Sequence, residues 1–284
     1  MESDATVIGV DLGGTKVQAA RVQAGDIKES QKQLISSSGK EEQVVGEVKA
    51  VISAVMTESV SGIGIGVPSV VDVERGIVYD VQNIPSWKEV HLKSILEKEF
   101  GIPVSMNNDA NCFALGEYRF GKGAGTRNFV GLIIGTGMAA GIVLNGQLYN
   151  GRHGGAGEFG MIPYRDQYVE YYASGQFFEN VHQVSGLTVA QQAASGDATA
   201  LGQFAEYGRH LANGIKSILY TLDPDKIVLG GSVSQSYAFF KDALWEELST
   251  FAYQPIIDDL QIEVSEHPMI PVLGASSLCY APLA

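Results

Sequence analysis

Cysteine is scarce in this sequence: Cys112 and Cys279 are its only two. They lie far apart and form no Cys-x-x-Cys pair, so the sequence excludes a small fold built on disulfides. Two isolated thiols are typical of a protein that stays in the reducing cytoplasm, and we expect that location.

Basic residues are also few. The chain holds 19 lysines and arginines against 32 aspartates and glutamates, which gives a net charge of −13. A nucleic-acid surface needs a basic patch, so we expect no nucleic-acid partner. A phosphate ligand is not excluded, because backbone N–H groups in glycine-rich loops create a local positive potential.

Long apolar runs are missing as well. The longest uncharged run contains the segment from Phe129 to Gln147, which is interrupted by glycines and Thr136. Its apolar part is shorter than the roughly 20 residues of a membrane-spanning helix. The opening "MESDATVIGV" lacks the basic and apolar pattern of a signal peptide. We therefore expect a soluble protein without a membrane partner.

Glycine, in contrast, is abundant: 34 of 284 residues, against roughly 7% in an average protein. The excess suggests tight turns close to a ligand. An apolar run, a glycine turn and a second apolar run follow one another in "TVIGVDLGGTKVQAARV", and again in "NFVGLIIGTGMAAGIVL". We interpret these segments as related openings of two half-domains.

Helix-like periodicity alternates with these strands. Apolar spacing predicts helices over residues 41–58 and 87–100, a third that begins near Asn108 and Asp109, and a long one over residues 197–222. Short apolar runs such as "GIGIGV" and "DKIVLGG" predict buried strands between them. Strand and helix alternate in both halves, so the predicted fold class is α/β.

Two segments match the spacing of nucleotide-binding motifs, but the residues and predicted elements around them exclude both motifs. "GEYRFGKG" has P-loop spacing, but Gly123 replaces the serine or threonine that would bind magnesium, and the segment follows a predicted helix instead of a strand. "GTGMAA" has the spacing of a dinucleotide fingerprint, but a strand follows it where a helix is required.

The turns "DLGGTK" and "GTGM" suit a polyphosphate better. Their N–H groups could face phosphate oxygens, with hydroxyl donors from Thr15 and Thr136 and a charge from Lys16. Asp11 at a strand end is placed to hold a hydrated Mg²⁺ ion. Either turn alone could be an ordinary hairpin; their joint presence favours phosphate binding.

Five ordered segments carry a family resemblance: "VIGVDLGGTK", "NNDANCFALGE", "GTGMAAGIVLNGQLYNG", "GAGEFG" and "DPDKIVLGGSV". Together they resemble the ROK sugar kinases (repressor, ORF, kinase) of the actin, sugar-kinase and heat-shock chaperone superfamily. The resemblance implies two ribonuclease-H-like, actin-like domains with a cleft for ATP and a hexose. We expect one domain over residues 1–114 plus 272–284 and the other over residues 115–271. Relatives are often dimers, which suggests a homodimer.

The resemblance also assigns roles. Asp109 matches the catalytic base and Asn108 a hexose-binding neighbour, while Glu158 and Glu170 match two ligands of sugar hydroxyls. Ser69 and Asn83 fall in loops that complete the sugar site. The positions that match phosphate and adenosine contacts are Gly13, Gly14, Thr15, Lys16, Gly135, Thr136, Gly137, Gly230 and Gly231. Of the five histidines, only His153 could lie near the phosphate cleft.

These roles agree with the chemistry. Phosphoryl transfer to a hydroxyl gains from a carboxylate that accepts the proton, and a predicted helix N-terminus favours the charged form of Asp109. The alternative is that Asp109 only caps this helix. Glu158 and Glu170 could each accept two hydroxyl hydrogen bonds, or could be solvated surface residues.

The chain departs from the family after "GEFG". Most ROK kinases have a histidine where Met161 stands, followed by a cysteine-rich zinc loop, but no cysteine lies between Met161 and Glu170. We expect no structural zinc. The missing histidine, and Ser69 where glycine is usual, leave the hexose open.

The leading hypothesis is an ATP- and Mg²⁺-dependent kinase for the 6-hydroxyl of glucose. Alternatives are a kinase for mannose, fructose or N-acetylmannosamine, a polyphosphate-dependent enzyme, a sugar-sensing regulator, and a sugar-binding protein without catalysis. Family repressors carry a helix-turn-helix ahead of the first phosphate motif. Because "VDLGGTK" begins at Val10, we expect no such module here.

Overall fold

The computed structural model describes residues 4–81, 83–152 and 154–280; His153 lies outside the described residues. The chain forms two compact units. Unit 1 comprises residues 1–125, 141–156 and 267–284, and unit 2 comprises residues 126–140 and 157–266. The domain bounds expected from the sequence differ from these units at residues 115–125, 141–156 and 267–271, and they stay a prediction.

Unit 1 is built on a five-stranded sheet with the order β3-β2-β1-β4-β8. Strands β1 to β3 form an antiparallel meander, and β4 and β8 extend it in parallel. The strands are β1 (Thr6–Leu12), β2 (Lys16–Gln23), β3 (Asp26–Leu34), β4 (Ile63–Val67) and β8 (Val104–Asn108). Four helices accompany this sheet: α1 (Glu41–Val55), α2 (Leu92–Phe100), α3 (Asp109–Phe120) and α10 (Ile270–Ser277).

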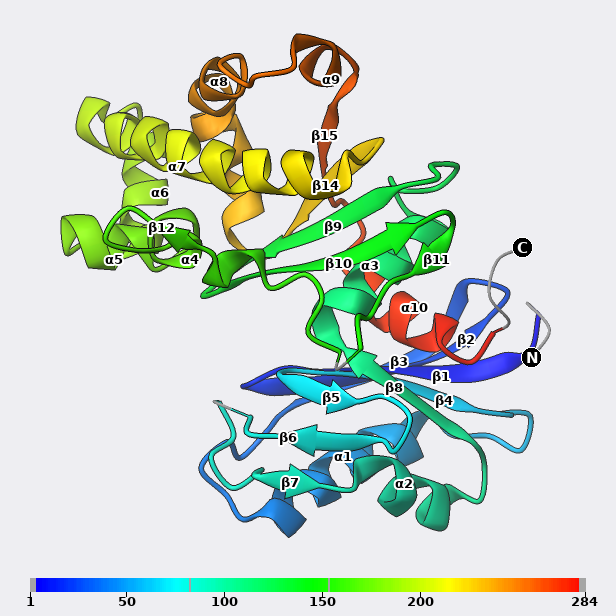
Figure 1. The fold of residues 1–284 in the computed structure, drawn as a ribbon. Coiled ribbons are helices and arrows are strands. Elements are labelled where there is room, and N and C mark those ends of the chain that lie inside the picture. Colours follow the sequence, from blue (N-terminus) through cyan, green and yellow to red (C-terminus); the bar gives the residue numbers. More distant parts are fainter. Residues whose placement is uncertain (1–3, 82, 153, 281–284) are drawn as a thin grey trace. The chain divides into compact units, whose positions relative to one another are not determined.

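The two faces of this sheet carry different side chains, because residues alternate along a strand. Ile8 and Val10 of β1 belong to an apolar core that includes the valines of α1. Gly9, between them, faces α10 on the other side: a Cβ at Gly9 would lie 2.0 Å from the Val272 carbonyl oxygen. Figure 1 shows α1 and α10 on opposite faces of the sheet.

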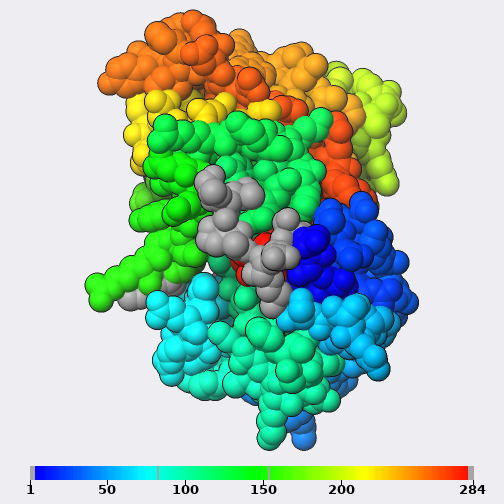
Figure 2. All heavy atoms as spheres, turned by 90° about the vertical axis from the view of Figure 1, so that its right-hand side faces the viewer, coloured from blue at the N-terminus to red at the C-terminus, as the bar shows by residue number. Residues whose placement is uncertain are grey.

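Helix α10 explains part of the glycine excess. A Cβ at Gly64 would lie 1.8 Å from the Ala275 carbonyl oxygen, and one at Gly274 would lie 1.6 Å from the Cys112 carbonyl oxygen. Helix α10 is buried along most of its length, and only a small part of this red segment is visible on the face shown in Figure 2. Several glycines therefore permit close helix packing and are not turn residues, which the sequence alone did not indicate.

Unit 2 contains the core of a second five-stranded sheet with the order β11-β10-β9-β14-β15. Its strands are β9 (Phe129–Ile134), β10 (Met138–Leu144), β11 (Gln147–Leu148), β14 (Lys226–Gly230) and β15 (Gln261–Val264), and the division into units falls within β10. When the strands of each sheet are numbered by their order along the chain, both sheets have the strand order 3-2-1-4-5. The predicted pair of related openings and the α/β, ribonuclease-H-like class are confirmed.

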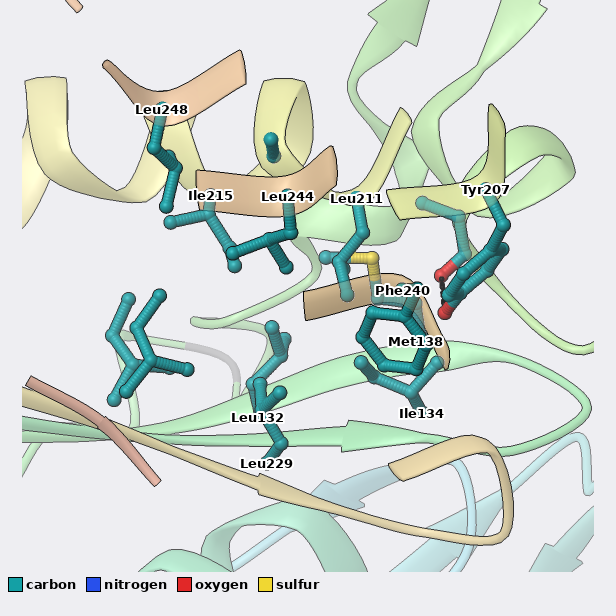
Figure 3. Packing of buried hydrophobic residues seen from close by; sticks show 14 of the residues in the cluster. Leu132, Ile134, Met138, Tyr207, Leu211, Ile215, Leu229, Phe240, Leu244 and Leu248 are labelled. Atoms are coloured by element: carbon teal, nitrogen blue, oxygen red, sulfur yellow. Dashed lines mark hydrogen bonds between the residues drawn. The ribbon is translucent and has the colours of Figure 1, made fainter. Parts of the chain in front are cut away.

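Helices α7 (Ala198–Leu222) and α8 (Tyr237–Leu248) complete the core of unit 2. Figure 3 shows Leu132 and Leu229 of the strands pointing toward Leu211 and Leu244 of these helices. The remaining helices and short elements of unit 2 are η1 (Phe159–Met161), β12 (Pro163–Tyr164), β13 (Gln167–Tyr168), α4 (Val169–Ala173), α5 (Phe177–His182), α6 (Gly186–Ala194), η2 (Val233–Ser236) and α9 (Gln254–Asp259).

One predicted helix begins later than expected. The helix predicted over residues 87–100 starts at Leu92, because Glu89–Val90 forms strand β7. Strand β7 joins β5 (Val70–Asp72) and β6 (Ile77–Tyr79) in a small sheet that the sequence did not reveal, with Val90 opposite Val78. Among the described residues, no helix has the length and apolar content needed to cross a membrane.

Candidate active site

The carboxyl ends of three parallel strands meet in unit 1. Asp11 on β1 is in register with Gly66 on β4, which is in register with Asn107 on β8. Such strand ends are the usual ligand sites of α/β sheets. Helix α3 begins directly after β8, at Asp109. The topology therefore places the predicted magnesium ligand and the predicted base at one edge of the same sheet.

The Cys112 thiol lies near both of these carboxylates. Burial raises the pKa of the Cys112 thiol well above its ordinary value, and the charges of Asp109 and Asp11 raise it further. A Cβ at Gly66 would lie 3.0 Å from the Cys112 sulfur and 3.6 Å from the Asp109 Cα. The thiol is thus a neutral packing group, and Gly66 provides the space for it beside the start of α3.

Asp11 is suited to a hard cation. Burial raises the pKa of its carboxyl, while the positive charge of Lys16 lowers it. A desolvated carboxylate gains from an added positive charge, and Mg²⁺ in phosphate sites often takes only one or two protein carboxylates besides water and phosphate oxygens. The described residues contain no group of three or more His, Cys, Asp or Glu side chains that could hold a metal by themselves.

The turn after Asp11 is a closed hairpin. The Gly13 N–H donates to the Lys16 carbonyl at 2.9 Å, and the Ile35 N–H donates to the Thr15 carbonyl at 3.0 Å. A Cβ at Gly14 would lie 2.5 Å from the Cβ of Asn83. The structure therefore packs Asn83, from the predicted sugar loop, directly on the first predicted phosphate loop.

Asn108 is the N-cap of α3. Its side-chain oxygen accepts hydrogen bonds from the N–H groups of Ala110, at 2.8 Å, and Asn111, at 3.3 Å. Asp109 also accepts from the Ala110 N–H, at 2.8 Å. Because Asn108 already fills the capping position, helix capping does not by itself explain the carboxylate of Asp109.

Ser69 holds Asn108 from the other side. Its carbonyl accepts a hydrogen bond from the Asn108 side-chain nitrogen, and its hydroxyl donates to the Tyr79 carbonyl at 2.9 Å. The backbone of Ser69 has a φ of 79°, in the region that favours glycine. Ser69 and Asn108, both predicted sugar ligands, are thus brought together, and their side chains order the backbone beside Asp109.

In unit 2, three sequence motifs converge on the turn after β9. Within this turn the Gly135 N–H donates to the Gly137 carbonyl at 2.9 Å. The Gly175 N–H donates to the Gly135 carbonyl at 2.7 Å. A Cβ at Gly160 would lie 2.4 Å from the Met138 carbonyl oxygen. We call residues 135–138 the second loop. Segments "GEFG" and "ASG" pack against it, and Thr136 at its tip is exposed.

The two predicted sugar-binding glutamates are neighbours. Partial burial and, next, the charge of Glu170 raise the pKa of the Glu158 carboxyl. Glu170 accepts a hydrogen bond from the Met138 N–H at 2.7 Å. Glu170 is therefore part of the frame of the second loop, a role that the sequence did not indicate. The proximity of two carboxylates makes a site that attracts several hydroxyl donors.

Met161, which stands in place of the family histidine, is 57% exposed. The segment that follows it forms the hairpin β12–β13, and aromatic residues hold this hairpin against α7. The Tyr164 hydroxyl lies 3.2 Å from the Nδ1 atom of His210, and the Tyr172 hydroxyl donates to Asp166. Arg165 at the hairpin turn lies over both tyrosine rings. We call these five residues the tyrosine cluster.

His210 is the buried member of the tyrosine cluster, with 3% of its surface exposed. Burial lowers the pKa of its imidazole, and the charge of Arg165 lowers it further. The sequence of α7 contained a signal for this burial: Tyr207, three residues before His210, and Leu211, directly after it, are both core residues.

The expectation of no structural zinc stays a prediction.

A cavity of about 400 Å³ adjoins the second loop within unit 2. The predicted contacts Gly230 and Gly231 are not among its lining residues. Gly231 instead makes a turn with a φ of 85°, and a Cβ there would lie 2.3 Å from the Ile134 carbonyl oxygen. The cavity is lined by Gly135, Thr136, Gly175, Gln176, Phe178, Glu179, Gly186, Leu187, Ala190, Phe204, Ser232, Val233 and Ser236.

Known proteins share this fold and sequence pattern. The glucokinase of Streptomyces coelicolor is 28% identical over 97% of this chain and 98% of its own length. The crystal structure of a ROK family glucokinase from Streptomyces griseus in complex with glucose and AMPPNP matches with a TM-score of 0.81 and 27% identity, over 96% of this chain and 98% of that chain. The xylose repressor of Bacillus spizizenii is 29% identical over 76% of this chain and 60% of the repressor.

A sequence profile described as "ROK family" matches residues 7–281, which is nearly the whole chain. The resemblance carried by the five segments is thereby confirmed, together with the actin-like α/β fold of the structural neighbours. The chain belongs to the ROK family.

Proposed function

We propose that this protein is a hexose kinase that transfers a phosphoryl group from ATP to the 6-hydroxyl of glucose. The observation that carries the proposal lies in unit 1: Asp11 and Asp109 both lie near Cys112 at the carboxyl ends of β1, β4 and β8, beside the glycine hairpin 11–16. A base and a cation ligand next to a phosphate loop are the groups that phosphoryl transfer requires.

In the proposed reaction, Asp109 accepts the proton of the sugar hydroxyl as its oxygen attacks the γ-phosphorus. The bond from that phosphorus to the bridging oxygen breaks, and ADP leaves. The N-terminus of α3 favours negative charge on Asp109, and Asn108 and Ser69 fix the backbone that presents it. Mg²⁺, when bound, would neutralise charge on the phosphates; Asp11 is the residue proposed to hold it, through water.

Unit 2 supplies the proposed donor site. The cavity beside the second loop, at about 400 Å³, falls within the size range of small-molecule sites. Its apolar lining from Phe178 and Leu187 suits a nucleoside base, and the N–H groups of the second loop suit phosphates. This cavity favours ATP over polyphosphate, which has no base to fill it. AMPPNP, bound by the Streptomyces griseus relative, is an analogue of ATP.

In unit 2, Glu158 and Glu170 are the proposed ligands of the sugar hydroxyls. In unit 1, the residues proposed to contact the sugar are Ser69, Asn83 and Asn108. The hexose is proposed as glucose because relatives of similar length include glucokinases. Homodimer formation remains a prediction from the family.

The test is ADP release with a panel of glucose, mannose, fructose and N-acetylmannosamine, with ATP or polyphosphate as donor. We expect the highest kcat/KM with glucose and ATP. Asp109→Asn should lower kcat by several orders of magnitude and leave AMPPNP binding nearly unchanged, whereas the control Asp26→Asn, in an exposed strand end, should keep full activity.

The result also separates the enzyme from a sugar-sensing regulator, a class to which the related xylose repressors belong. Sugar binding without turnover from any donor would reject the kinase and leave the regulator and the sugar-binding protein without catalysis. Full activity of Asp109→Asn would reject Asp109 as the base.

A further inference from the structure

Gln176 connects three parts of unit 2. Its side-chain nitrogen donates to the Thr136 carbonyl at 2.8 Å and to the second oxygen of Glu170 at 3.4 Å. The first oxygen of Glu170 accepts from the Met138 N–H at 2.7 Å. The carboxylate and the amide thus form a bridge across the second loop, from Thr136 at its tip to Met138 at its end. Gln176 also lines the cavity beside the loop.

The packing around this bridge leaves little freedom. A Cβ at Gly137 would lie 2.7 Å from the carboxylate oxygen of Glu170, so the loop approaches that carboxylate as closely as glycine permits. The backbone of Gly175, next to Gln176, is itself bonded to Gly135. A shift of Glu170 or Gln176 must therefore move the second loop.

The bridge does not exhaust the acceptor capacity of Glu170. An ionised carboxylate has about four acceptor positions, and the second loop and Gln176 occupy one on each oxygen. Two remain for sugar hydroxyls. The Gln176 nitrogen, in contrast, has two hydrogens, and its two bonds use both. Gln176 is thus committed to the bridge, while Glu170 can serve the bridge and a sugar together.

We propose that Gln176 is a positioning residue that couples hexose binding to nucleotide binding, by tying the sugar ligand Glu170 to the second loop. The inference rests on the proposed function. A hexose that fixes Glu170 also fixes Gln176 and the N–H groups of the second loop. The loop therefore loses its conformational entropy when the hexose binds, and the nucleotide then binds to a loop that is already ordered. By linkage, the nucleotide must strengthen hexose binding by the same factor.

The experiment measures the dissociation constant of AMPPNP by titration calorimetry, without and with saturating glucose. In the natural protein we expect glucose to tighten AMPPNP binding by at least about fivefold, the lower end of ordinary coupling between sites. Gln176→Met keeps the length of the side chain and removes both donors. We expect it to lose the coupling, leaving a factor below about two, whatever its affinity for glucose alone.

Gln191→Met is the matched control. Gln191 lies on the exposed face of α6 in the same unit, so its replacement should retain the full coupling factor. Gln176→Glu is a second variant: its carboxylate repels Glu170 and cannot donate to Thr136 when ionised, so coupling should be lost there too. Coupling that survives in both Gln176 variants would overturn the proposal, as would its absence from the natural protein.

The readout also separates this proposal from the kinase assignment. If no hexose is phosphorylated but AMPPNP and glucose still bind with coupling that Gln176→Met removes, the bridge stands without the reaction. If turnover is normal and the coupling factor does not depend on Gln176, the kinase stands without the bridge.

Discussion

The side chain of Asn108 donates a hydrogen bond to the backbone carbonyl of Ser69 at 3.2 Å. This contact joins the end of β8, where α3 begins, to the loop after β4. Ser69 adopts a φ of 79° to present that carbonyl, and its hydroxyl bonds to the Tyr79 carbonyl. The unfavourable backbone of one residue thus supports the N-cap of the helix that starts at Asp109.

A pair of substitutions at Ser69 separates strain from hydrogen bonding. Ser69→Ala and Ser69→Gly both lose the hydroxyl, but only glycine adopts a positive φ without strain. We expect Ser69→Gly to be more stable than Ser69→Ala by about 1 kcal/mol. Urea unfolding of the two variants measures this difference. Equal stabilities, or a more stable alanine variant, would show that the backbone at this position is not strained.

The buried His210 predicts a pH dependence of stability. Its folded-state pKa is lowered from the ordinary value of 6.5. Below pH 6.5 the unfolded chain therefore binds a proton that the folded chain does not, and stability falls as pH falls. His210 faces the hydroxyl of Tyr164 and the charges of Arg165, Glu206 and Glu247.

Replacement of His210 isolates this contribution. The free energy of unfolding should decline less between pH 7.5 and pH 5.5 in His210→Gln than in the natural protein. An exposed residue that does not titrate gives the control: Gln191→Met on α6 should decline like the natural protein. An identical decline in His210→Gln would show that His210 takes up its proton equally in both states.

Metal removal should affect activity and not the fold. The hairpin β12–β13 is held by the tyrosine cluster, through the bonds of Tyr164 to His210 and of Tyr172 to Asp166. We expect EDTA to leave the melting temperature unchanged and to stop phosphoryl transfer, with Mg²⁺ restoring it. Elemental analysis should find no stoichiometric zinc. One zinc per chain, or a lower melting temperature in EDTA, would contradict this expectation.

Two glycine-to-alanine substitutions should have opposite effects. Gly202 lies in α7 with no atom within 4 Å of an added Cβ. Gly202→Ala should therefore stabilise the protein by about 0.5–1 kcal/mol, through helix propensity and reduced freedom of the unfolded chain. An added Cβ at Gly274 would lie 1.6 Å from a backbone oxygen of α3, so Gly274→Ala should fail to fold normally. Thermal unfolding and soluble yield check both; a destabilised Gly202→Ala would contradict the first.

The repeated strand–glycine–strand pattern allowed the sheets to be predicted from the sequence. Local signals of this kind also located α3, where "NND" follows an apolar strand, and α7, which begins directly after its N-cap Asp197. They failed at residues 87–91. There the apolar spacing continues that of α2, but Val90 pairs with Val78, and such a pairing between distant segments leaves no mark on local periodicity.

The candidate site was only partly predictable, because contacts between residues far apart in the chain leave no local pattern in the sequence. The resemblance named Glu170 as a sugar ligand, and only the structure shows it bonded to Met138, across a gap of 32 residues. Gln176, Phe178 and Glu179 line the cavity in unit 2, yet their segment carries no phosphate or adenosine signature. The packing of the folded chain determines which residues line a cavity, and the spacing of residues in the sequence does not show that packing.

Helix α10 has a consequence for the order of biosynthesis. The ribosome makes β1 and β4 early, but the part of their face at Gly9 and Gly64 packs against residues 270–277, and these leave the ribosome after the whole of unit 2 has been made. The earlier part of unit 1 must therefore wait, incompletely packed, while more than half of the chain is synthesised. Its apolar face is exposed to chaperones and proteases during that interval. A nascent chain that ends before Ile270 should carry an incomplete first unit, whatever the state of the second.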